Sequence, residues 1–441
     1  MRNHNVKRNI LTGGVDFFSS NLRASKHLQG RVTPVGFNDW RSGDQPSYVS
    51  DIRKVADRTG WWLMVSKEMG IRGLGDWFVS NGQLFGQTTK PAAAAGQRAI
   101  GDRDRPVKEE DMRILITGGA GFIGSHMADR LVSEGHEVVA LDNLGTGLRE
   151  NVPAEAQFIK GDVSQFAALE AAFSGGLDAV FHIAGQVSLI RSFADPVIDL
   201  RTNVEGTVNV LRQCVKHRVP RLLYASSMTV YGSDAPLPTP ETTRCEPVSY
   251  YGITKHAAER YVHVTSQRVD LDFEFRVTSF RMYNVYGPRQ ALDNPYQGVL
   301  GIFLGNLLRG EAITIFGDGE QSRDFIYIND VVDAWVGALE NPASYGQVFN
   351  VGSGTQIRIN RLADSVLRTF GRTREEHSVR YAPGRPGEQR WMEADNTSAR
   401  RVLGWEPRTS FEEGLAETVR WATAEHERST AVNQAIEENL A

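Results

Sequence analysis

The sequence predicts an α/β protein in which a doubly wound parallel sheet is followed by a smaller C-terminal lobe. From Met112 onward, short apolar runs that resemble buried strands alternate with amphipathic, helix-like stretches. This alternation is typical of a parallel sheet covered by helices on both faces. A glycine-rich turn joins the first strand-like run to the first helix-like stretch, which is the second observation behind the prediction. After about Arg281 the alternation becomes less regular, which indicates a separate lobe.

Seven strands are expected from the apolar runs and from the turn-forming residues that bound them. In chain order they are Arg113–Thr117, Glu137–Leu141, Gln157–Lys160, Ala179–Ile183, Arg221–Ala225, Phe273–Arg281 and Val348–Val351.

The glycine-rich turn has the spacing of a dinucleotide-binding turn. Its glycines are Gly118, Gly121 and Gly124, between a strand-like run and a helix start. The first glycine permits a sharp turn, the second lets the phosphates approach the backbone, and the third lets the helix pack on the strand. A pyrophosphate would then bind the N–H groups at the helix N-terminus. The turn therefore predicts a Rossmann sheet that binds a dinucleotide.

The second expected strand supports the same interpretation. It ends at Asp142, 18 positions after Gly124. A carboxylate at this position accepts hydrogen bonds from the adenosine ribose and repels a 2′-phosphate. We therefore expect NAD rather than NADP.

Composition narrows the possible functions. The chain has 441 residues and a net charge of −4, so it lacks the basic footprint of a nucleic-acid-binding protein. Its two cysteines, Cys214 and Cys245, form neither a disulfide framework nor a zinc cluster, and we expect no metal and a reducing, cytoplasmic location. No apolar stretch approaches bilayer length, so we expect no membrane association.

Candidate catalytic side chains occur at Tyr251 and Lys255, which share one face of a helix at this spacing. The positive charge of Lys255 is expected to lower the pKa of the Tyr251 phenol and make it a general base. Ser226 and Ser227 end a buried strand, where a hydroxyl can bind a substrate oxygen or simply terminate the strand. His182 lies within a strand, and we interpret it as a packed histidine.

Together these motifs resemble the extended short-chain dehydrogenase/reductase family, most closely its nucleotide-sugar epimerases of the UDP-glucose 4-epimerase type. The resemblance covers Met112 to about Ala424. It implies that Ser227, Tyr251 and Lys255 are catalytic. It also implies that NAD contacts Gly118, Gly121, Phe122, Ile123, Gly124, Asp142, Asn143, Asp162, Val163, Ala184, Gly185, Gln186, Asn203, Tyr251, Lys255 and Tyr283.

The resemblance extends to the substrate lobe. There Asn284, Arg323 and Arg385 match residues that bind the diphosphate of a UDP-sugar, Glu388 matches a ribose-binding acid, and Ser227 contacts the sugar. The implied reaction is 4-epimerisation through transient oxidation at C4 by tightly bound NAD, which makes the protein an isomerase. The family commonly dimerises through two long helices, so a homodimer is expected.

Some positions depart from related enzymes and leave alternatives open. Met228 and Thr229 replace the Asp-Glu pair of 4,6-dehydratases, which argues against a dehydratase. The segment Arg289–Gln297 differs from the typical uronate epimerase segment, which weakens a hexuronate substrate without removing it. Met392 stands where a side chain controls access for N-acetyl sugars, and methionine leaves that question open. A reductase and a non-catalytic nucleotide-sugar-binding protein remain as further alternatives.

Residues 1–87 contain two echoes of the downstream domain. Residues 41–51 align without gaps on residues 385–395, and residues 12–21 echo 117–126 with Asp16 and Ser19 in place of glycines. We interpret 1–87 as a truncated, degenerate copy of the ends of a related epimerase domain that binds no cofactor; the alternative is a packing module. The other expected segments are a linker (88–111), a mainly NAD-binding domain (112–280), a mainly substrate-binding lobe (281–424) and a tail (425–441).

Overall fold

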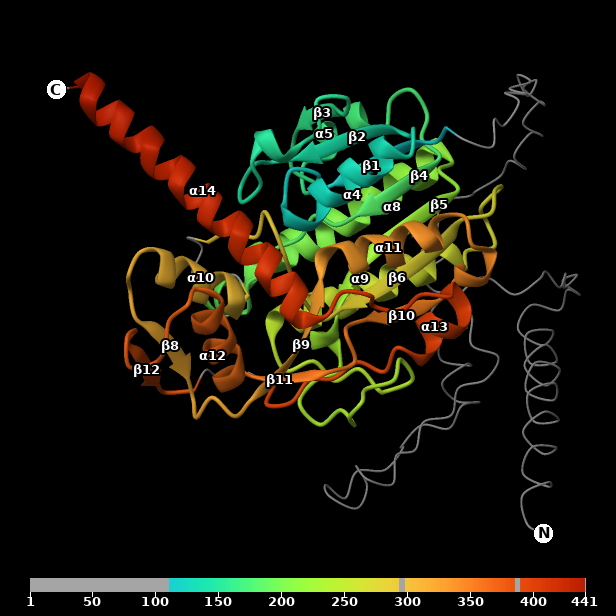
Figure 1. Ribbon diagram of the computed structural model, residues 1–441. Helices are drawn as coiled ribbons and strands as arrows, with labels where there is room; N and C mark the ends of the chain where they lie inside the picture. The colour runs from blue at the N-terminus through green and yellow to red at the C-terminus, as the bar shows by residue number, and fades with distance from the viewer. Residues whose placement is uncertain (1–110, 293–297, 385–388, 441) are drawn as a thin grey trace, which may run out of the picture. The chain divides into compact units, whose positions relative to one another are not determined.

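The structure is a computed structural model that describes residues 111–292, 298–384 and 389–440. Its centre is a parallel sheet with the strand order β10-β6-β5-β4-β1-β2-β3 (Figure 1). The strands are β1 (Arg113–Thr117), β2 (Glu137–Asp142), β3 (Gln157–Lys160), β4 (Ala179–His182), β5 (Arg221–Ser227), β6 (Arg276–Met282) and β10 (Val348–Val351). All seven predicted strands are confirmed. The largest difference is that β6 begins at Arg276 rather than Phe273.

Apolar side chains cover both faces of this sheet. On β1, Ile114 and Ile116 belong to the core cluster that includes Met127, whereas Leu115 belongs to the cluster that includes Val210. Successive residues of a strand point to opposite faces, so one strand serves two cores. The predicted doubly wound Rossmann fold is therefore confirmed.

The helices that cover the sheet come mainly from the connections between its strands. The cluster around Ile114 includes side chains from α4 and α11, and the cluster around Leu115 includes side chains from α5, α8 and α9. These helices and the shorter ones between them are α4 (Phe122–Ser133), η2 (Arg149–Asn151), α5 (Phe166–Ala172), α6 (Leu189–Ala194), α7 (Pro196–Asp199), η3 (Leu200–Glu205), α8 (Gly206–His217), η4 (Met228–Val230), α9 (Tyr250–Ser266) and α11 (Ile328–Leu339).

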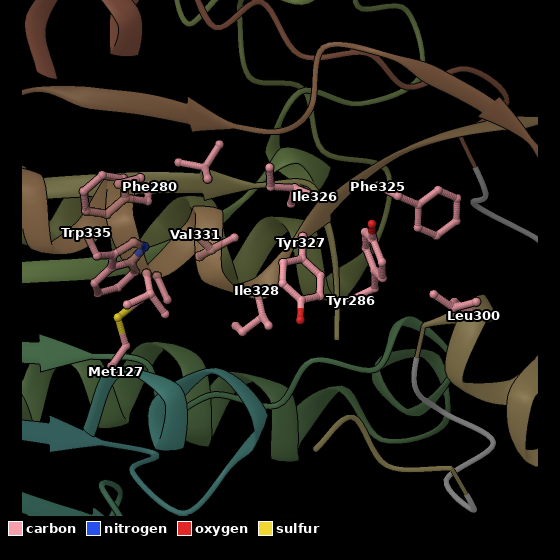
Figure 2. Packing of buried hydrophobic residues seen from close by; sticks show 14 of the residues in the cluster. Met127, Phe280, Tyr286, Leu300, Phe325, Ile326, Tyr327, Ile328, Val331 and Trp335 are labelled. Carbon is pink, nitrogen blue, oxygen red and sulfur yellow. The ribbon is translucent and has the colours of Figure 1, made fainter. Parts of the chain in front are cut away.

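Trp335 of α11 anchors one of the two cores. Its ring stacks on Phe280 of β6 with centroids 4.7 Å apart (Figure 2). The ring centroid of Phe181 of β4 lies 5.5 Å from that of Trp335. Stacked aromatic rings add stabilisation beyond the area that they bury. This contact fixes α11 on the sheet.

The smaller lobe is built around two small sheets, β11-β9-β7 and β12-β8. It is interleaved with the large sheet, because β10 returns to pair with β6. Its elements are β7 (Asn284–Tyr286), α10 (Val299–Leu308), β8 (Ile313–Phe316), β9 (Ser322–Tyr327), β11 (Gln356–Arg358), α12 (Ile359–Thr369), β12 (Val379–Ala382) and α14 (Phe411–Leu440). The helices η5 (Pro342–Ser344) and α13 (Thr397–Leu403) instead pack beside β6 and β10 of the large sheet.

The domain boundaries stay predictions. Helix α14 runs from Phe411 to Leu440 through the position where the tail was expected to begin. The proposed degenerate copy and all of the linker before Asp111 lie outside the described residues. Within the described residues, no helix combines the length and apolar character needed to cross a membrane.

The strand order reverses beside β1, which pairs with β2 on one side and with β4 on the other. In open parallel sheets, ligands bind outside the carboxyl ends of the strands at such a switch point. The glycine turn follows β1 directly, so it lies where the fold places a ligand.

Candidate active site

The glycine turn is held by steric contacts that only glycine satisfies. Gly118 has φ +74°, and a Cβ there would lie 2.9 Å from the backbone nitrogen of Ala184. A Cβ on Gly124 would lie 2.0 Å from the Gly118 carbonyl oxygen. By contrast, a Cβ on Gly121 would meet only that same oxygen, at 3.3 Å, so protein packing alone does not demand glycine there. Close approach of a phosphate explains it better.

The remaining parts of this wall fit a dinucleotide. Helix α4 begins after Gly121, which provides no side-chain cap, so its first N–H groups can bind a pyrophosphate. The Asp142 carboxylate accepts hydrogen bonds from the N–H groups of Ala120 (3.0 Å) and Leu144 (2.8 Å). It thereby ties the end of β2 to the glycine turn at the position where a ribose would bind.

Asp162 follows β3 and is held beside the end of β2. Asn143 Nδ2 donates to the Asp162 carboxylate at 2.7 Å, and Ser164 donates to it through both its N–H and its hydroxyl. Burial raises the pKa of Asp162, but these hydrogen bonds outweigh it and lower the pKa. The carboxylate is thus held charged and in place.

A cavity of about 820 Å³ opens at this edge of the sheet and extends into the smaller lobe. The glycine turn lines it together with side chains from β2, β5, α9 and β7. The predicted residues on its wall are Gly118, Gly121, Phe122, Ile123, Gly124, Asp142, Asn143, Asp162, Val163, Ala184, Gly185, Ser227, Tyr251, Lys255, Tyr283, Asn284 and Arg323. This volume is that of a site for a sizeable ligand.

The three predicted catalytic residues converge on this cavity. Ser227 ends β5, and Tyr251 and Lys255 lie in the first turns of α9, whose N-cap Ser249 accepts a hydrogen bond from the Gly252 N–H. Ser227 forms a hydrogen bond with the Tyr251 phenol. The Thr229 hydroxyl, which sequence reasoning did not assign to the site, donates to Ser227 Oγ at 2.9 Å.

The predicted lowering of the Tyr251 pKa is wrong for this structure. Burial raises the pKa of Tyr251 to about 12, and the hydrogen bond with Ser227 only partly opposes this effect. Burial also lowers the pKa of Lys255 to about 8, and its Nζ lies 4.6 Å from the centre of the Tyr224 ring. The sequence argument omitted the free energy of moving both groups out of water.

Gln186 and Asn203 brace the site from behind the cavity wall. Asn203 Oδ1 accepts from the Gln186 N–H at 2.8 Å, and its Nδ2 donates to the Gln186 carbonyl and to Thr254 Oγ1, both at 3.1 Å. Asn203 lies in η3, a one-turn π-helix, and such irregularities are frequent at functional sites. Sequence reasoning singled out Asn203 but missed Thr254, which lies next to Lys255.

A buried ion pair also stands behind the catalytic helix. Glu259, one turn after Lys255, accepts from Arg281 at 2.6 and 3.0 Å and from the Ser226 hydroxyl at 2.6 Å. Sequence reasoning missed this pair, although the i, i+4 spacing from Lys255 was a usable signal. The packed role predicted for His182 is confirmed: its ring contacts the hydroxyls of Thr117 (2.7 Å) and Thr207 (2.9 Å).

The side of the cavity away from the glycine turn belongs to the smaller lobe. Asn284 Nδ2 donates to the Asp324 carbonyl at 3.2 Å and lies 3.7 Å from the sulfur of Met392, which also lines the cavity. The Arg323 guanidinium is buried and donates to the carbonyls of Ser322 and Gln389. Two further predicted substrate residues, Arg385 and Glu388, lie outside the described residues.

The fold and the site define an α/β enzyme of the Rossmann type with a serine, a tyrosine and a lysine beside its dinucleotide wall. The sequence pattern of the NAD dependent epimerase/dehydratase family matches residues 114–352. The chain belongs to this family, so the resemblance to extended short-chain dehydrogenase/reductase enzymes is confirmed and the cofactor is NAD.

Individual relatives carry different activities. The chain is 39% identical over 318 residues to the UDP-glucose 4-epimerase of Mycolicibacterium smegmatis, a match that covers 70% of this chain and 98% of the relative. It is similar to the crystal structure of the Thermotoga maritima UDP-glucose 4-epimerase with UDP-glucose (38% identity, TM-score 0.66, 70% of this chain and 98% of that one). It is also 33% identical to UDP-glucuronic acid decarboxylase 5 of Arabidopsis thaliana, over 70% of this chain and 88% of the relative.

Proposed function

We propose that the protein is a nucleotide-sugar 4-epimerase of the UDP-glucose/UDP-galactose type. The observation that carries the proposal is the convergence of Ser227, Tyr251 and Lys255 on one cavity, while Met228 and Thr229 occupy the positions of the dehydratase acid/base pair. Without that pair, the site has no carboxyl couple to expel a sugar hydroxyl as water. The UDP-glucose 4-epimerases among the relatives support the same choice.

Each residue then has a defined task. Bound NAD supplies the hydride acceptor, and afterwards the donor, for C4 of the sugar. Tyr251 removes the proton of the 4-hydroxyl and returns it, and Ser227 shares the hydrogen bond to that oxygen. Lys255, one turn after Tyr251 on α9, is proposed to supply positive charge to the phenolate when it forms, against the burial that raises the pKa of Tyr251.

The diphosphate would be held by the smaller lobe. Asn284 and Arg323 line the cavity there, and Arg385 is proposed to join them. A guanidinium and an amide suit diphosphate oxygens, because both donate several hydrogen bonds in a fixed geometry. Anchoring at the diphosphate leaves the 4-keto sugar able to turn, so that the hydride returns to its opposite face.

The proposal is tested with a panel of UDP-, dTDP-, CDP- and GDP-sugars. We expect conversion of UDP-glucose to UDP-galactose and back, with no change in mass and no net consumption of NAD. Chromatographic separation of the C4 epimers measures it. Loss of carbon dioxide would show a decarboxylase, loss of water a dehydratase, and net NADH oxidation a reductase; each outcome would overturn the proposal.

UDP-N-acetylhexosamines are a second candidate substrate class. Met392 supports this candidate, because a flexible, unbranched side chain lines the cavity beside Asn284. A UDP-hexuronate 4-epimerase is the third candidate. Including UDP-N-acetylglucosamine and UDP-glucuronate in the same panel separates the three.

We further propose that the protein is a cytoplasmic homodimer. Ile253, Tyr261 and Val264 of α9 are each about half exposed, so the catalytic helix presents apolar side chains to solvent. Patches of this kind commonly mark protein–protein interfaces. Sedimentation equilibrium measures the oligomeric state, and a monomer at micromolar concentration would contradict the proposal.

A further inference from the structure

A second buried carboxylate lies next to the catalytic lysine. Asp199, the last residue of α7, is fully buried and accepts hydrogen bonds from Gln186 Nε2 at 2.6 Å and from Thr254 Oγ1 at 2.7 Å. Thr254 directly precedes Lys255 in α9. Gln186 follows Gly185, where a Cβ would lie 3.7 Å from Lys255 Nζ. Two neutral donors, both adjacent in sequence to residues at Lys255, thus hold the carboxylate in place.

The other groups around Lys255 carry little net charge. Glu259 shares its helix, but its charge is paired with Arg281 at 2.6 Å. Burial lowers the pKa of His182 of β4 to about 3, so its ring is neutral. Tyr224 of β5 and Tyr251 of α9 have pKa values raised by burial and are also neutral. Asp199 is therefore the main negative charge that faces Lys255.

The charges of Asp199 and Lys255 influence each other. Burial lowers the pKa of Lys255, and Asp199 works against that effect more strongly than Glu259 does. In the same way, burial raises the pKa of Asp199, and Lys255 counteracts this rise. Asp199 also raises the pKa of Tyr251. One carboxylate therefore acts on both catalytic groups in the same direction.

We propose that Asp199 is a positioning residue that supplies the counter-charge of Lys255 and so sets the pH range in which Tyr251 and Lys255 act. The inference rests on the proposed epimerase function. Asp199 lies behind residues of the cavity wall, so it acts through Lys255 and Tyr251 rather than on the sugar. Its hydrogen bonds also join the loop after β4 to the first turns of α9.

The variant Asp199→Asn tests the charge with little change in shape. The amide oxygen can still accept from Gln186, and the Thr254 hydroxyl can donate instead to the Tyr251 carbonyl, which lies 3.0 Å away. We expect both limbs of the kcat pH profile to move to lower pH by about one unit, because a negative charge that favours the protonated forms of Lys255 and Tyr251 is lost. A rate that falls equally at every pH would show a purely structural role and overturn the proposal.

Two variants control for other effects. Asp195→Asn removes a carboxylate four positions earlier, and the asparagine can still serve as the N-cap of α7. The kcat pH profile of this variant should therefore coincide with that of the wild type. Asp199→Glu keeps the charge and should also keep the wild-type limbs. If Asp199→Asn does not fold, as judged by circular dichroism, Asp199→Ser must move the limbs in the same direction.

A titration separates this inference from the proposed function. The tyrosinate absorbance of the holoenzyme minus that of Tyr251→Phe reports the ionisation of Tyr251 without any turnover. The same difference in the Asp199→Asn background should have its midpoint at lower pH. An unchanged midpoint would overturn the inference. A shifted midpoint in a protein that converts no nucleotide sugar would support the electrostatic role of Asp199 and overturn the proposed function.

Discussion

The glycine turn after β1 and the helix α9 line the same cavity, but different forces hold them. In the turn, Gly118 and Gly124 are required because any Cβ would meet backbone atoms at 2.9 and 2.0 Å. In α9, burial moves the pKa of Tyr251 and the pKa of Lys255 away from their ordinary values. The turn is therefore a steric device that is insensitive to pH, whereas α9 is an electrostatic device that responds to pH.

The largest effect is expected for Tyr251→Phe. The substitution keeps the ring and removes the group proposed to exchange a proton with the sugar. We expect kcat for UDP-glucose epimerisation to fall by roughly 10²–10⁴-fold while the protein retains its NAD. A coupled assay for the second epimer measures the rate.

The neighbouring Tyr250→Phe is the matched control. Tyr250 is 46% exposed and packs on Phe193, so its hydroxyl can be lost with little consequence. We expect wild-type turnover from this variant. If Tyr251→Phe kept full activity on every nucleotide sugar, the proposed mechanism would be wrong.

The steric requirement for glycine in the turn after β1 is tested by Gly124→Ala. Its Cβ would lie 2.0 Å from the Gly118 carbonyl oxygen, so the turn or α4 must shift. We expect a loss of about 3 kcal/mol of unfolding free energy, at all pH values alike, and loss of bound NAD. Urea unfolding and the NAD content of the purified protein measure the two effects.

A helical glycine with free space around it provides the control for Gly124. A Cβ on Gly337 in α11 would meet nothing within 4 Å. Gly337→Ala should therefore raise the unfolding free energy by up to about 1 kcal/mol. Equal losses from both substitutions would show that helix propensity, and not the contact with Gly118, governs the response.

The sequence predicted the steric region far better than the electrostatic one. Glycine spacing and the strand that ends at Asp142 are local patterns, and the structure places them together as expected. The environment of Lys255 depends on Thr254 and Glu259 of the same helix, but also on Asp199 of α7 and on Arg281 of β6, which pairs with Glu259. Only the fold brings Asp199 and Arg281 to α9, so the pKa of Tyr251 could not be predicted from its spacing to Lys255.

The smaller lobe shows the same limit. Local patterns pointed to Asn284 and Arg323 as substrate residues, and both line the cavity. The return of β10 to the edge of the large sheet beside β6 is a long-range pairing that no local pattern encodes. The chain therefore passes from the smaller lobe to the large sheet at β10 and then back to the smaller lobe.

The burial of Lys255 in α9 predicts that Lys255→Met changes the stability of the cofactor-free protein in a pH-dependent way. The pKa of Lys255 is lowered from 10.5 in the unfolded chain to about 8 in the folded protein. Below about pH 8 both states carry the charge, and burying it destabilises the fold by up to about 3 kcal/mol. Between pH 8 and 10.5 the unfolded state binds the extra proton, so the wild type gains stability as pH rises.

Lys255→Met should therefore be more stable than the wild type near pH 7, and this advantage should shrink towards pH 10.5. Urea unfolding across this range measures the difference. The exposed Lys216→Met, whose ammonium pairs with Glu170 at the surface, is the control and should show little dependence on pH. If the unfolding free energy of Lys255→Met relative to the wild type increased with pH, the prediction would be wrong.

The smallest effect is expected from removing residues 1–111. The match to the Mycolicibacterium smegmatis epimerase accounts for 98% of that protein with 70% of this chain. We therefore expect a protein that begins at Met112 to keep its NAD, and to keep kcat within about twofold of the full chain. Loss of folding or turnover would instead identify the N-terminal segment, with Trp61, Trp62 and Trp77, as a packing module that the catalytic domain requires.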